Sequence, residues 1–304
     1  LAAVMLRLCR RAVKRIAAPF QAPVTVASVR SFSEASNGGS GSSNKTTHFG
    51  FQTVSEGLKK GMVGEVFTGV ANNYDVMNDV MSLGVHRLWK DHFIASVQPV
   101  SGNKILDVAG GTGDIAFRAI DYVRKNEKGE DLEMEVVTVC DINPSMLEEG
   151  KKKVSDGGYF TSTGMDQVRF IEGDAENLPF EDASFDIYTI AFGLRNVTEI
   201  PKALSEAQRV LKPGGRFFCL EFSRVENPLL GPLYDLYSFN VIPPMGELVA
   251  QNRDAYQYLV ESIRKHPPQQ ELKRLMIQSG FTSVQYENLS MGIVAIHSGF
   301  KSVD

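Results

Sequence analysis

The most informative segment of the chain is "KILDVAGGTGDIAF", residues 104–117. An apolar run enters a cluster of glycines, and a run with the apolar spacing of a helix leaves it. Residues 111–116 also fit the pattern G-x-G-x-x-G/A, which is typical of loops that hold a dinucleotide at the start of a helix. The stretch therefore predicts a strand, a ligand-binding loop and a helix. It leaves open whether the ligand is a dinucleotide or another nucleotide-shaped cofactor.

Composition limits the classes of protein to consider. The chain has 304 residues, of which 43% are hydrophobic, and this is enough for one large core with extensions. The three cysteines lie far apart and the five histidines show no metal-binding spacing, so we expect neither a disulfide framework nor a metal site. Cys140 and Cys219 lie in apolar runs and are expected to be buried free thiols. No run approaches the roughly 20 apolar residues of a membrane span.

The first part of the chain differs in charge from the rest. Residues 1–33 contain six basic residues and no acidic one, which is typical of a mitochondrial transit peptide cleaved near Phe32. A solvated basic tail is the alternative. We predict a transit peptide over 1–32, a Gly/Ser-rich flexible linker over 33–48 and a folded domain over 49–304. The rest of the chain contains 26 basic and 36 acidic residues, which gives it a net charge of −10. This charge argues against general nucleic-acid binding.

From residue 104 onward, strand-like apolar runs alternate with helical patterns, which predicts an α/β fold with a parallel sheet between two helical layers. The expected strands cover 104–109, 134–142, 167–173, 185–193 and 216–223. The last two runs, 282–289 and 292–299, are close enough to pair as a hairpin. The expected helices cover 112–125, a segment opened by Pro144, a segment from Pro201 that ends at Gly214-Gly215, and 269–279.

Residues 51–97 precede the sheet and have apolar residues at helical spacing. One interpretation is that they form one or two helices packed on the sheet edge. The other is that they form a lid over the ligand cleft, because such clefts open at the carboxyl ends of parallel strands.

Acidic residues flank the glycine loop and bear on the choice of cofactor. Asp107 precedes the turn and Asp114 follows it. A carboxylate within a few ångströms of a pyrophosphate costs on the order of 1–4 kcal/mol. S-adenosylmethionine instead carries a sulfonium and an ammonium, which these carboxylates would attract. The loop therefore favours S-adenosylmethionine over a dinucleotide, with helix capping and turn formation as the alternative role of the two acids.

Two further acids end strands of the predicted sheet. Asp141 ends the second strand, where a carboxylate can accept both ribose hydroxyls. It lies 30 residues after Gly111, which is longer than the roughly 20 of the dinucleotide pattern. Asp174 and the backbone of Ala175 are placed to meet the adenine edge. The predicted cofactor-binding set is Asp107, Gly110, Gly111, Thr112, Gly113, Asp141, Asp174 and Ala175.

Several motifs together resemble the ubiquinone/menaquinone-biosynthesis C-methyltransferase family from about Phe67 to Gly299. They are "LDVAGGTGD", "GDAENLPFEDASFD", "FGLRNV", "RVLKPGGRF", "LEFS", "YSFNVIPPMGELV" and the closing "YLVESIRKHPPQ…GFTSV". The resemblance implies a class I SAM-dependent methyltransferase fold, a Rossmann-like three-layer sandwich with a seven-stranded, mostly parallel sheet and an antiparallel last strand. With the mitochondrial leader, it implies C-methylation of a polyprenylated methoxy-benzoquinol ring in ubiquinone (coenzyme Q) biosynthesis.

Methyl transfer from a sulfonium is an in-line displacement that needs alignment and a proton acceptor or oxyanion partner, but no covalent nucleophile. Arg195 and Asn196 follow the fourth strand and are the first catalytic candidates. Arg195 would stabilise a phenolate and Asn196 would orient a hydroxyl, whereas a structural ion pair is the alternative for Arg195. Tyr74 or a water would relay the proton, because arginine is a poor base. Bacterial members of the family have a serine where this chain has Ala191, so only backbone could serve there.

The segment 227–250 is strongly apolar and could line a groove for the polyprenyl tail, open to a membrane or a partner protein. Ordinary helix packing and a homodimer contact are the alternatives. We expect a location in the mitochondrial matrix, peripheral to the inner membrane, with other enzymes of a coenzyme Q biosynthetic complex as partners. The rival functions are an O-methyltransferase acting on the same ring, a cofactor-binding scaffold subunit and a nicotinamide oxidoreductase.

Overall fold

The computed structural model describes residues 45–70, 78–79, 82, 84–127, 136–160, 164–250 and 252–303. The predicted transit peptide and most of the predicted linker lie outside these residues. None of the described helices combines the length and the apolar character that a membrane span requires.

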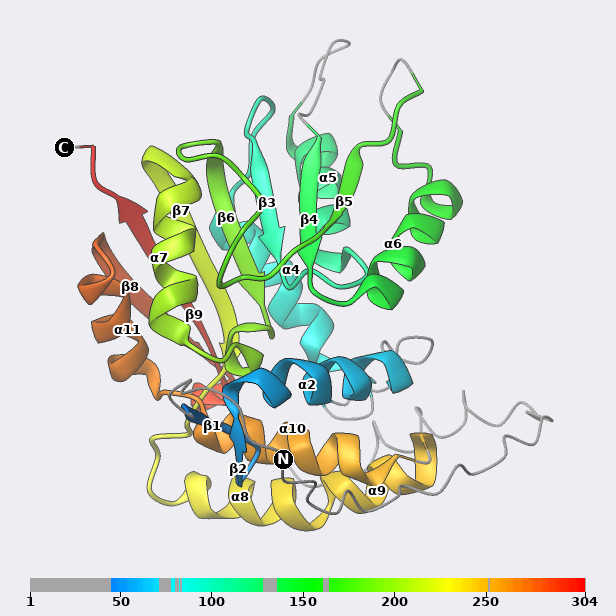
Figure 1. The fold of residues 1–304 in the computed structure, drawn as a ribbon, viewed down its shortest axis with the longest axis vertical. Coiled ribbons are helices and arrows are strands. Elements are labelled where there is room, and N and C mark those ends of the chain that lie inside the picture. Colours follow the sequence, from blue (N-terminus) through cyan, green and yellow to red (C-terminus); the bar gives the residue numbers. More distant parts are fainter. Residues whose placement is uncertain are drawn as a thin grey trace, which may run out of the picture.

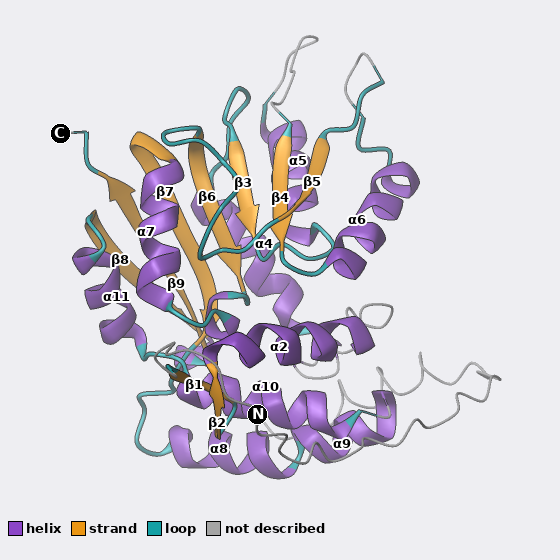
Figure 2. Ribbon diagram, viewed as in Figure 1, coloured by secondary structure: helices purple, strands orange, loops and turns teal. Residues whose placement is uncertain are grey.

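A seven-stranded sheet with the order β5-β4-β3-β6-β7-β9-β8 forms the centre of the molecule (Figures 1 and 2). Its parallel strands β3 to β7 are Ile105–Val108, Val137–Asp141, Val168–Glu172, Phe185–Ala191 and Leu211–Phe222. The last strand of the chain, β9 (Val294–Lys301), runs antiparallel between β7 and β8 (Phe281–Leu289). The predicted fold class, the antiparallel last strand and the C-terminal hairpin are confirmed.

Helices cover both faces of the sheet, because successive strand residues point into two different cores. Ile105 and Ile187 contribute to a core under α4 (Val85–Val97), α5 (Asp114–Asn126) and α6 (Pro144–Gly157). Leu106 and Ile190 contribute to a second core under α7 (Ile200–Val210) and α11 (Gln269–Gln278). Cys140 and Cys219 are buried free thiols, as predicted.

The position of α4 differs from the expected packing on the sheet edge. Trp89, Phe93 and Val97 form one buried stripe on this helix, and the Phe93 ring lies 6.4 Å from the Phe218 ring on β7. Because its apolar stripe contacts central strands, α4 covers the middle of one face, and the edge interpretation is wrong for this helix.

The predicted end of the helix that begins near Pro201 is also wrong. α7 ends at Val210, and Gly214-Gly215 lie within β7 rather than at the end of the helix. The pairing of β7 with β6 shifts between Leu211 and Arg216, and Gly214 has a φ of +76° in this shift. Pro213 cannot donate a backbone hydrogen bond, so this segment forms an irregular entry to the strand.

Ordered structure begins earlier than expected. A hairpin of β1 (Thr46–Phe49) and β2 (Gln52–Ser55) starts before Phe49, within the segment predicted to be a flexible linker. The Phe49 ring stacks on Tyr258 of α10 (Arg253–Lys265) at 4.2 Å between centroids. This contact joins the hairpin to a helix in the last quarter of the chain. The polar sequence of the linker gives no signal for it.

α2 (Glu56–Val70) lies across the carboxyl ends of the strands, with α8 (Leu230–Asn240), α9 (Ile242–Ala250) and α10 beyond it (Figure 1). Two side chains hold α2 in this place. Buried Lys59 donates to the backbone oxygen of Val197 at 2.8 Å. Asn143, which caps the N-terminus of α6, donates its side-chain amide to Thr68 Oγ1 at 3.1 Å. α2 therefore borders the site that the sheet creates.

Replacing Ile187 with alanine should lower the free energy of unfolding by about 2–5 kcal/mol, because Ile187 is fully buried in a central strand and its loss leaves a cavity. Urea denaturation measures this change. Leu88→Ala is the matched control: Leu88 is 66% exposed on α4, and its loss should cost less than about 0.5 kcal/mol. Equal effects of the two substitutions would contradict the described core.

Candidate active site

A cleft with about 1100 Å³ of empty space, open mouth included, lies at the carboxyl ends of β3, β4 and β6. The chain runs outward from β3 through β4 to β5 and then returns to β6 on the other side of β3, so the strand order reverses here. Ligands of doubly wound sheets bind at such a reversal. The loops after four strands line the cleft, and α2 and α4 add residues to its wall.

Seven of the eight residues predicted to bind the cofactor line this cleft. They are Asp107, Gly110, Gly111, Thr112, Asp141, Asp174 and Ala175. Gly113 is the exception. It caps α5 with a φ of +83°, and a Cβ there would lie 3.2 Å from the Phe170 ring. Its role in the structure is to form the turn and to allow close packing behind the cleft.

The glycine loop forms a floor that has no room for side chains. A Cβ on Gly110 would lie 2.6 Å from Asp107 Oδ2, and one on Gly111 would lie 2.9 Å from Met146 Cε. Gly111 has a φ of +54°, and its N–H donates to Asp141 Oδ2 at 2.8 Å. Because side chains are absent, a ligand can approach the backbone closely, and this fits a nucleoside cofactor.

Asp107 is a fully buried carboxyl group in the cleft wall. Thr189 Oγ1 donates to its Oδ1 at 2.8 Å, and its Oδ2 has no hydrogen-bond partner among the described residues. Burial raises the pKa of Asp107 to about 7, with the Thr189 bond acting in the opposite direction and the Asp114 and Asp141 charges adding to the rise. An unpartnered buried oxygen is costly, so a cationic or hydrogen-bonding ligand would be stabilised here.

Asp141 and Asp174 already make contacts within the protein. Asp141 accepts from the backbone N–H groups of Gly111 and Asn143, both at 2.8 Å, and burial raises its pKa in spite of these bonds. A carboxylate has about four acceptor positions, so positions remain for ribose hydroxyls. Asp174 Oδ2 lies 2.5 Å from Lys60 Nζ of α2, so an adenine amino group would share this carboxylate with a lysine.

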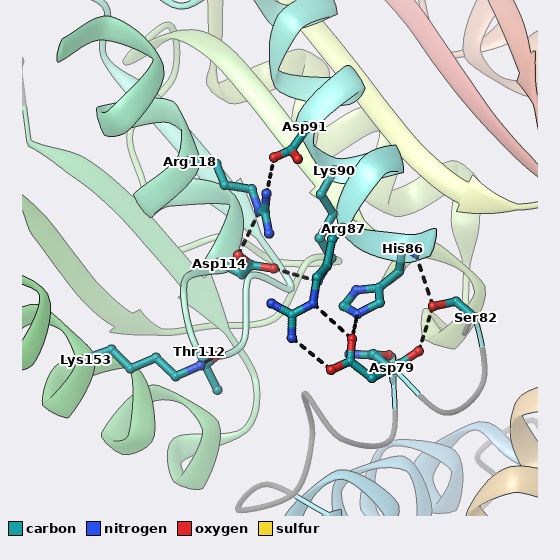
Figure 3. A network of polar contacts seen from close by, with 11 residues as sticks. Asp79, Ser82, His86, Arg87, Lys90, Asp91, Thr112, Asp114, Arg118 and Lys153 are labelled. Atoms are coloured by element: carbon teal, nitrogen blue, oxygen red, sulfur yellow. Dashed lines mark hydrogen bonds and ion pairs between the residues drawn. The ribbon is translucent and has the colours of Figure 1, made fainter. Parts of the chain in front are cut away.

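Asp114 does not act as the free anion that the sequence suggested (Figure 3). Its two oxygens contact Lys90 Nζ at 2.7 Å and Arg118 Nε at 2.9 Å. Burial alone would raise the pKa of Asp114, but the two cations outweigh burial and hold the pKa at about 2. Its negative charge is therefore compensated within the protein, and the expectation that it attracts a cationic ligand is wrong.

Arg195 and Asn196 belong to a short 3₁₀ helix, η2 (Leu194–Asn196), but only Asn196 lines the cleft. The buried guanidinium of Arg195 forms an ion pair with Glu221 of β7 at 3.0 Å and donates to the backbone oxygen of Phe192. The structural ion pair that was the alternative for Arg195 is thus present, and it ties η2 to the sheet. Tyr74 lies outside the described residues.

Asn196 is oriented from behind by α10. Tyr258 donates its hydroxyl to Asn196 Oδ1 at 3.0 Å. Burial raises the pKa of Tyr258 to about 12, so the hydroxyl stays protonated and remains a donor. This bond occupies the amide oxygen and leaves the amide N–H groups of Asn196 for a ligand. Ala191 also lines the cleft, and its methyl group offers no hydrogen bond there.

Several residues of the cleft were not predicted from the sequence. Lys60 and Val63 come from α2, Lys90 from α4, and Ile142 and Met146 follow β4. Ile142 carries the clearest signal in retrospect, because it is an apolar residue directly after a strand-end acid, and it is 42% exposed. The two lysines carry no such signal, since lysine on a helix is usually solvated. α2 borders the cleft, as the lid interpretation requires.

A sequence model of the ubiE/COQ5 methyltransferase family matches residues 54–301. The mitochondrial 2-methoxy-6-polyprenyl-1,4-benzoquinol methylase of Bos taurus is 55% identical over 280 residues, which cover 84% of this chain and 83% of that protein. The enzyme of the same name from Drosophila melanogaster is 55% identical over 258 residues, covering 84% of this chain and 85% of that protein.

Solved structures share the fold at low sequence identity. A SAM-dependent methyltransferase of Thermotoga maritima, a possible histamine N-methyltransferase, has a TM-score of 0.53 and 20% identity, and the match covers 78% of this chain and 99% of that chain. The [4+2]-cyclase SpnF has a TM-score of 0.55 and 17% identity, and the match covers 80% of this chain and 96% of that chain. At these identities the likeness concerns the fold alone.

Asp107→Asn should change the pH dependence of stability. The folded pKa of Asp107, about 7, lies above the ordinary aspartate value of 3.8, so the carboxyl destabilises the fold increasingly as the pH rises from about 4 to about 7. Across this window the variant should gain on the order of 2–4 kcal/mol in unfolding free energy relative to the original chain. Denaturant unfolding at several pH values measures the difference.

The variant serves as the reference because two buried histidines also make the stability of the fold depend on pH, and their contribution changes with pH in the direction opposite to that of Asp107. Burial lowers the pKa of His266 to about 3 and that of His297 to about 4, so their contribution to stability falls as the pH drops below 6.5. Both histidines are present in the two proteins and cancel in the difference. A difference that does not vary with pH would show that folding does not raise the pKa of Asp107.

Proposed function

Because the chain belongs to the ubiE/COQ5 methyltransferase family, we propose that it methylates a ring carbon of a 2-methoxy-6-polyprenyl-1,4-benzoquinol in ubiquinone biosynthesis. S-adenosylmethionine is its methyl donor. One observation carries the proposal for this site: the glycine floor and the oriented amide of Asn196 border the same cleft. A cofactor held on the glycine floor would therefore lie beside a substrate held by Asn196.

The residues of the cleft fit S-adenosylmethionine, which supplies an electrophilic methyl group when bound. Gly110 and Gly111 admit the ligand to the backbone. The unpartnered Oδ2 of Asp107 can accept a hydrogen bond from its ammonium group, and Asp141 can accept from its ribose. The loop with Asp174 and Ala175, and the apolar side chains Ile142, Met146 and Val63, supply polar and apolar surfaces for the adenine ring.

On the substrate side, the nucleophile is a ring carbon activated by neighbouring hydroxyl groups. As the bond from this carbon to the methyl group forms and the methyl–sulfur bond breaks, the ring hydroxyl becomes acidic and the ring releases one proton. We assign to Asn196 the role of donating an amide N–H to this oxygen, which orients the ring and favours its ionised form. Water or Tyr74 would relay the proton.

Arg195 is assigned a less direct role than the sequence suggested. Its guanidinium is paired with Glu221 and does not line the cleft. In this arrangement it is a positioning residue that holds η2, and hence Asn196, against β7. Direct stabilisation of a phenolate would require Arg195 to leave a buried partner, and removing one member of a buried ion pair typically costs about 3–5 kcal/mol.

The proposed substrate also bears on location. The names of the relatives and the basic N-terminal segment point to the mitochondrion. Because a polyprenyl tail stays in lipid, we further propose a location in the matrix, peripheral to the inner membrane. The apolar segment 227–250 forms α8 and α9, and Leu229 and Leu236 remain exposed there. Such residues could meet the tail, a second copy of the chain or other enzymes of a coenzyme Q biosynthetic complex.

Incubation with methyl-labelled S-adenosylmethionine and a short-chain methoxy-benzoquinol tests the proposed reaction. We expect the label on a ring carbon and a ratio of one label per ring, determined by mass spectrometry and NMR of the product. Label on oxygen would identify an O-methyltransferase instead. Cofactor binding without any labelled product would favour the scaffold function.

Asn196→Ala should lower kcat by about 10²-fold or more, as expected for the loss of one donor to a developing oxyanion. The dissociation constant of S-adenosylhomocysteine should stay within about twofold, because the loss concerns the substrate side. Tyr258→Phe alone should lower kcat by about 10-fold, since it removes one neutral hydrogen bond that orients Asn196. Steady-state kinetics and calorimetry measure these quantities.

The double variant distinguishes positioning from independent roles. If Tyr258 acts through Asn196, adding Tyr258→Phe to Asn196→Ala should lower kcat no further. Fully additive losses would refute this coupling. For Arg195, an alanine variant with unchanged turnover and normal cofactor binding would remove the residue from the mechanism altogether.

A further inference from the structure

Lys90 of α4 is a buried cation in the wall of the cleft (Figure 3). Its Nζ lies 2.7 Å from Asp114 Oδ2. Asp114 has a second cation, because Arg118 Nε lies 2.9 Å from its other oxygen. Arg118 does not line the cleft, whereas Lys90 does. Asp114 is thus held by one cation behind the cleft and by another that faces it.

The ammonium group of Lys90 has more donors than its described contacts use. A lysine carries three N–H donors. Within the part of the chain that the structure describes, Asp114 is the hydrogen-bond acceptor of Lys90 Nζ. The remaining donors belong to a side chain that borders the cleft and is only 6% exposed. A ligand with an acidic group would therefore find a desolvated cation with donors to spare, and charge-assisted bonds are strong in such surroundings.

Opposite charges meet at the glycine-loop end of the cleft. Asp107 has an unpartnered Oδ2 directly under Gly110, and the charge of Lys90 acts on Asp107. The other lysine among the described residues of the cleft, Lys60, lies at the far end, where it pairs with Asp174 and Glu176. Asp114 and Asp141 also line this end, but the oxygens of Asp114 are held by Lys90 and Arg118, and Asp141 accepts two backbone N–H groups. The glycine-loop end thus combines one carboxyl oxygen that has no partner among the described residues, on Asp107, with the ammonium group of Lys90.

This pair of charges matches a zwitterion. The methionine end of S-adenosylmethionine carries an ammonium group and a carboxylate on the same carbon, whereas the adenosine end carries no acid. We propose that Lys90 binds the carboxylate at the methionine end of the cofactor, while Asp107 accepts its ammonium group. The proposal rests on the cofactor and not on the identity of the ring substrate. It makes α4, which precedes the glycine loop in the chain, part of the cofactor site.

Decarboxylated S-adenosylmethionine provides the test, because it lacks only the carboxylate. Calorimetric titration of the full chain should show that S-adenosylmethionine binds about 10- to 100-fold more tightly than the decarboxylated compound, the range expected for one hydrogen bond to a charged group. In Lys90→Met, which keeps an unbranched apolar stem, affinity for S-adenosylmethionine should fall by the same factor. Affinity for the decarboxylated compound should stay within about twofold, so the preference disappears.

Arg118→Met is the matched control, since it removes the other cation from Asp114 without touching the cleft wall. It should change the affinities for both ligands by the same factor and preserve the preference. Lys90→Arg, which keeps the positive charge, should also preserve the preference. Lys90→Gln, which keeps a polar side chain beside Asp114 but removes the charge, should abolish the preference, and this variant maintains the test if Lys90→Met does not fold.

Three results would overturn the proposal. Equal affinity of the original chain for the two ligands would show that no group contacts the carboxylate. An equal loss for both ligands in Lys90→Met would show that Lys90 acts only by holding Asp114. A preference that survives in Lys90→Met would assign the carboxylate to another residue. If the original chain bound neither ligand, the cofactor assignment itself would fail, which is a separate outcome from these three.

Discussion

The close approach between the glycine loop and the ends of β3 and β4 is the constraint on which the site depends. Gly110 and Gly111 have no side chains, and so the loop can lie against Asp107 while the Gly111 N–H bonds to Asp141. This single arrangement brings two strand-end carboxyl groups to one cleft and starts α5 in the right direction. A side chain at Gly110 would collide with Asp107, and one at Gly111 would collide with Met146.

The charge of the cleft is set by pairing rather than by the number of acids. Asp114 is compensated by Lys90 and Arg118, and Asp174 is compensated by Lys60. Asp107 stands apart, because burial raises its pKa and one of its oxygens has no partner among the described residues. The preference for a positively charged methyl donor therefore depends on a few groups at the glycine-loop end, and not on a ring of anions.

Elements outside the central sheet complete the substrate side. The β1–β2 hairpin places Phe49 on Tyr258, and Tyr258 in turn holds the amide of Asn196. Asn196 belongs to the short helix η2, and the Arg195–Glu221 pair ties this helix to β7. The position of Asn196 is thus set from both sides by segments that are distant in sequence.

The features that could be predicted from the sequence are those that depend on neighbours along the chain. Apolar runs that alternate with helical patterns predicted the strands, and the glycine cluster with the strand-end acids predicted the floor of the cleft, because apolar runs, φ above zero and position at a strand end are local properties. The end of α7 was predicted wrongly from the sequence, because Gly214 belongs to the irregular start of β7, whose conformation depends on pairing with β6. The contacts of Asp114 with Lys90, of Arg195 with Glu221 and of Asn196 with Tyr258 could be identified only once the chain was folded. They join residues 24 to 62 positions apart, and whether charges or polar groups meet across such gaps depends on how whole elements pack. The other partner of Asp114, Arg118, lies four positions away on the same helix, where spacing alone brings the two together.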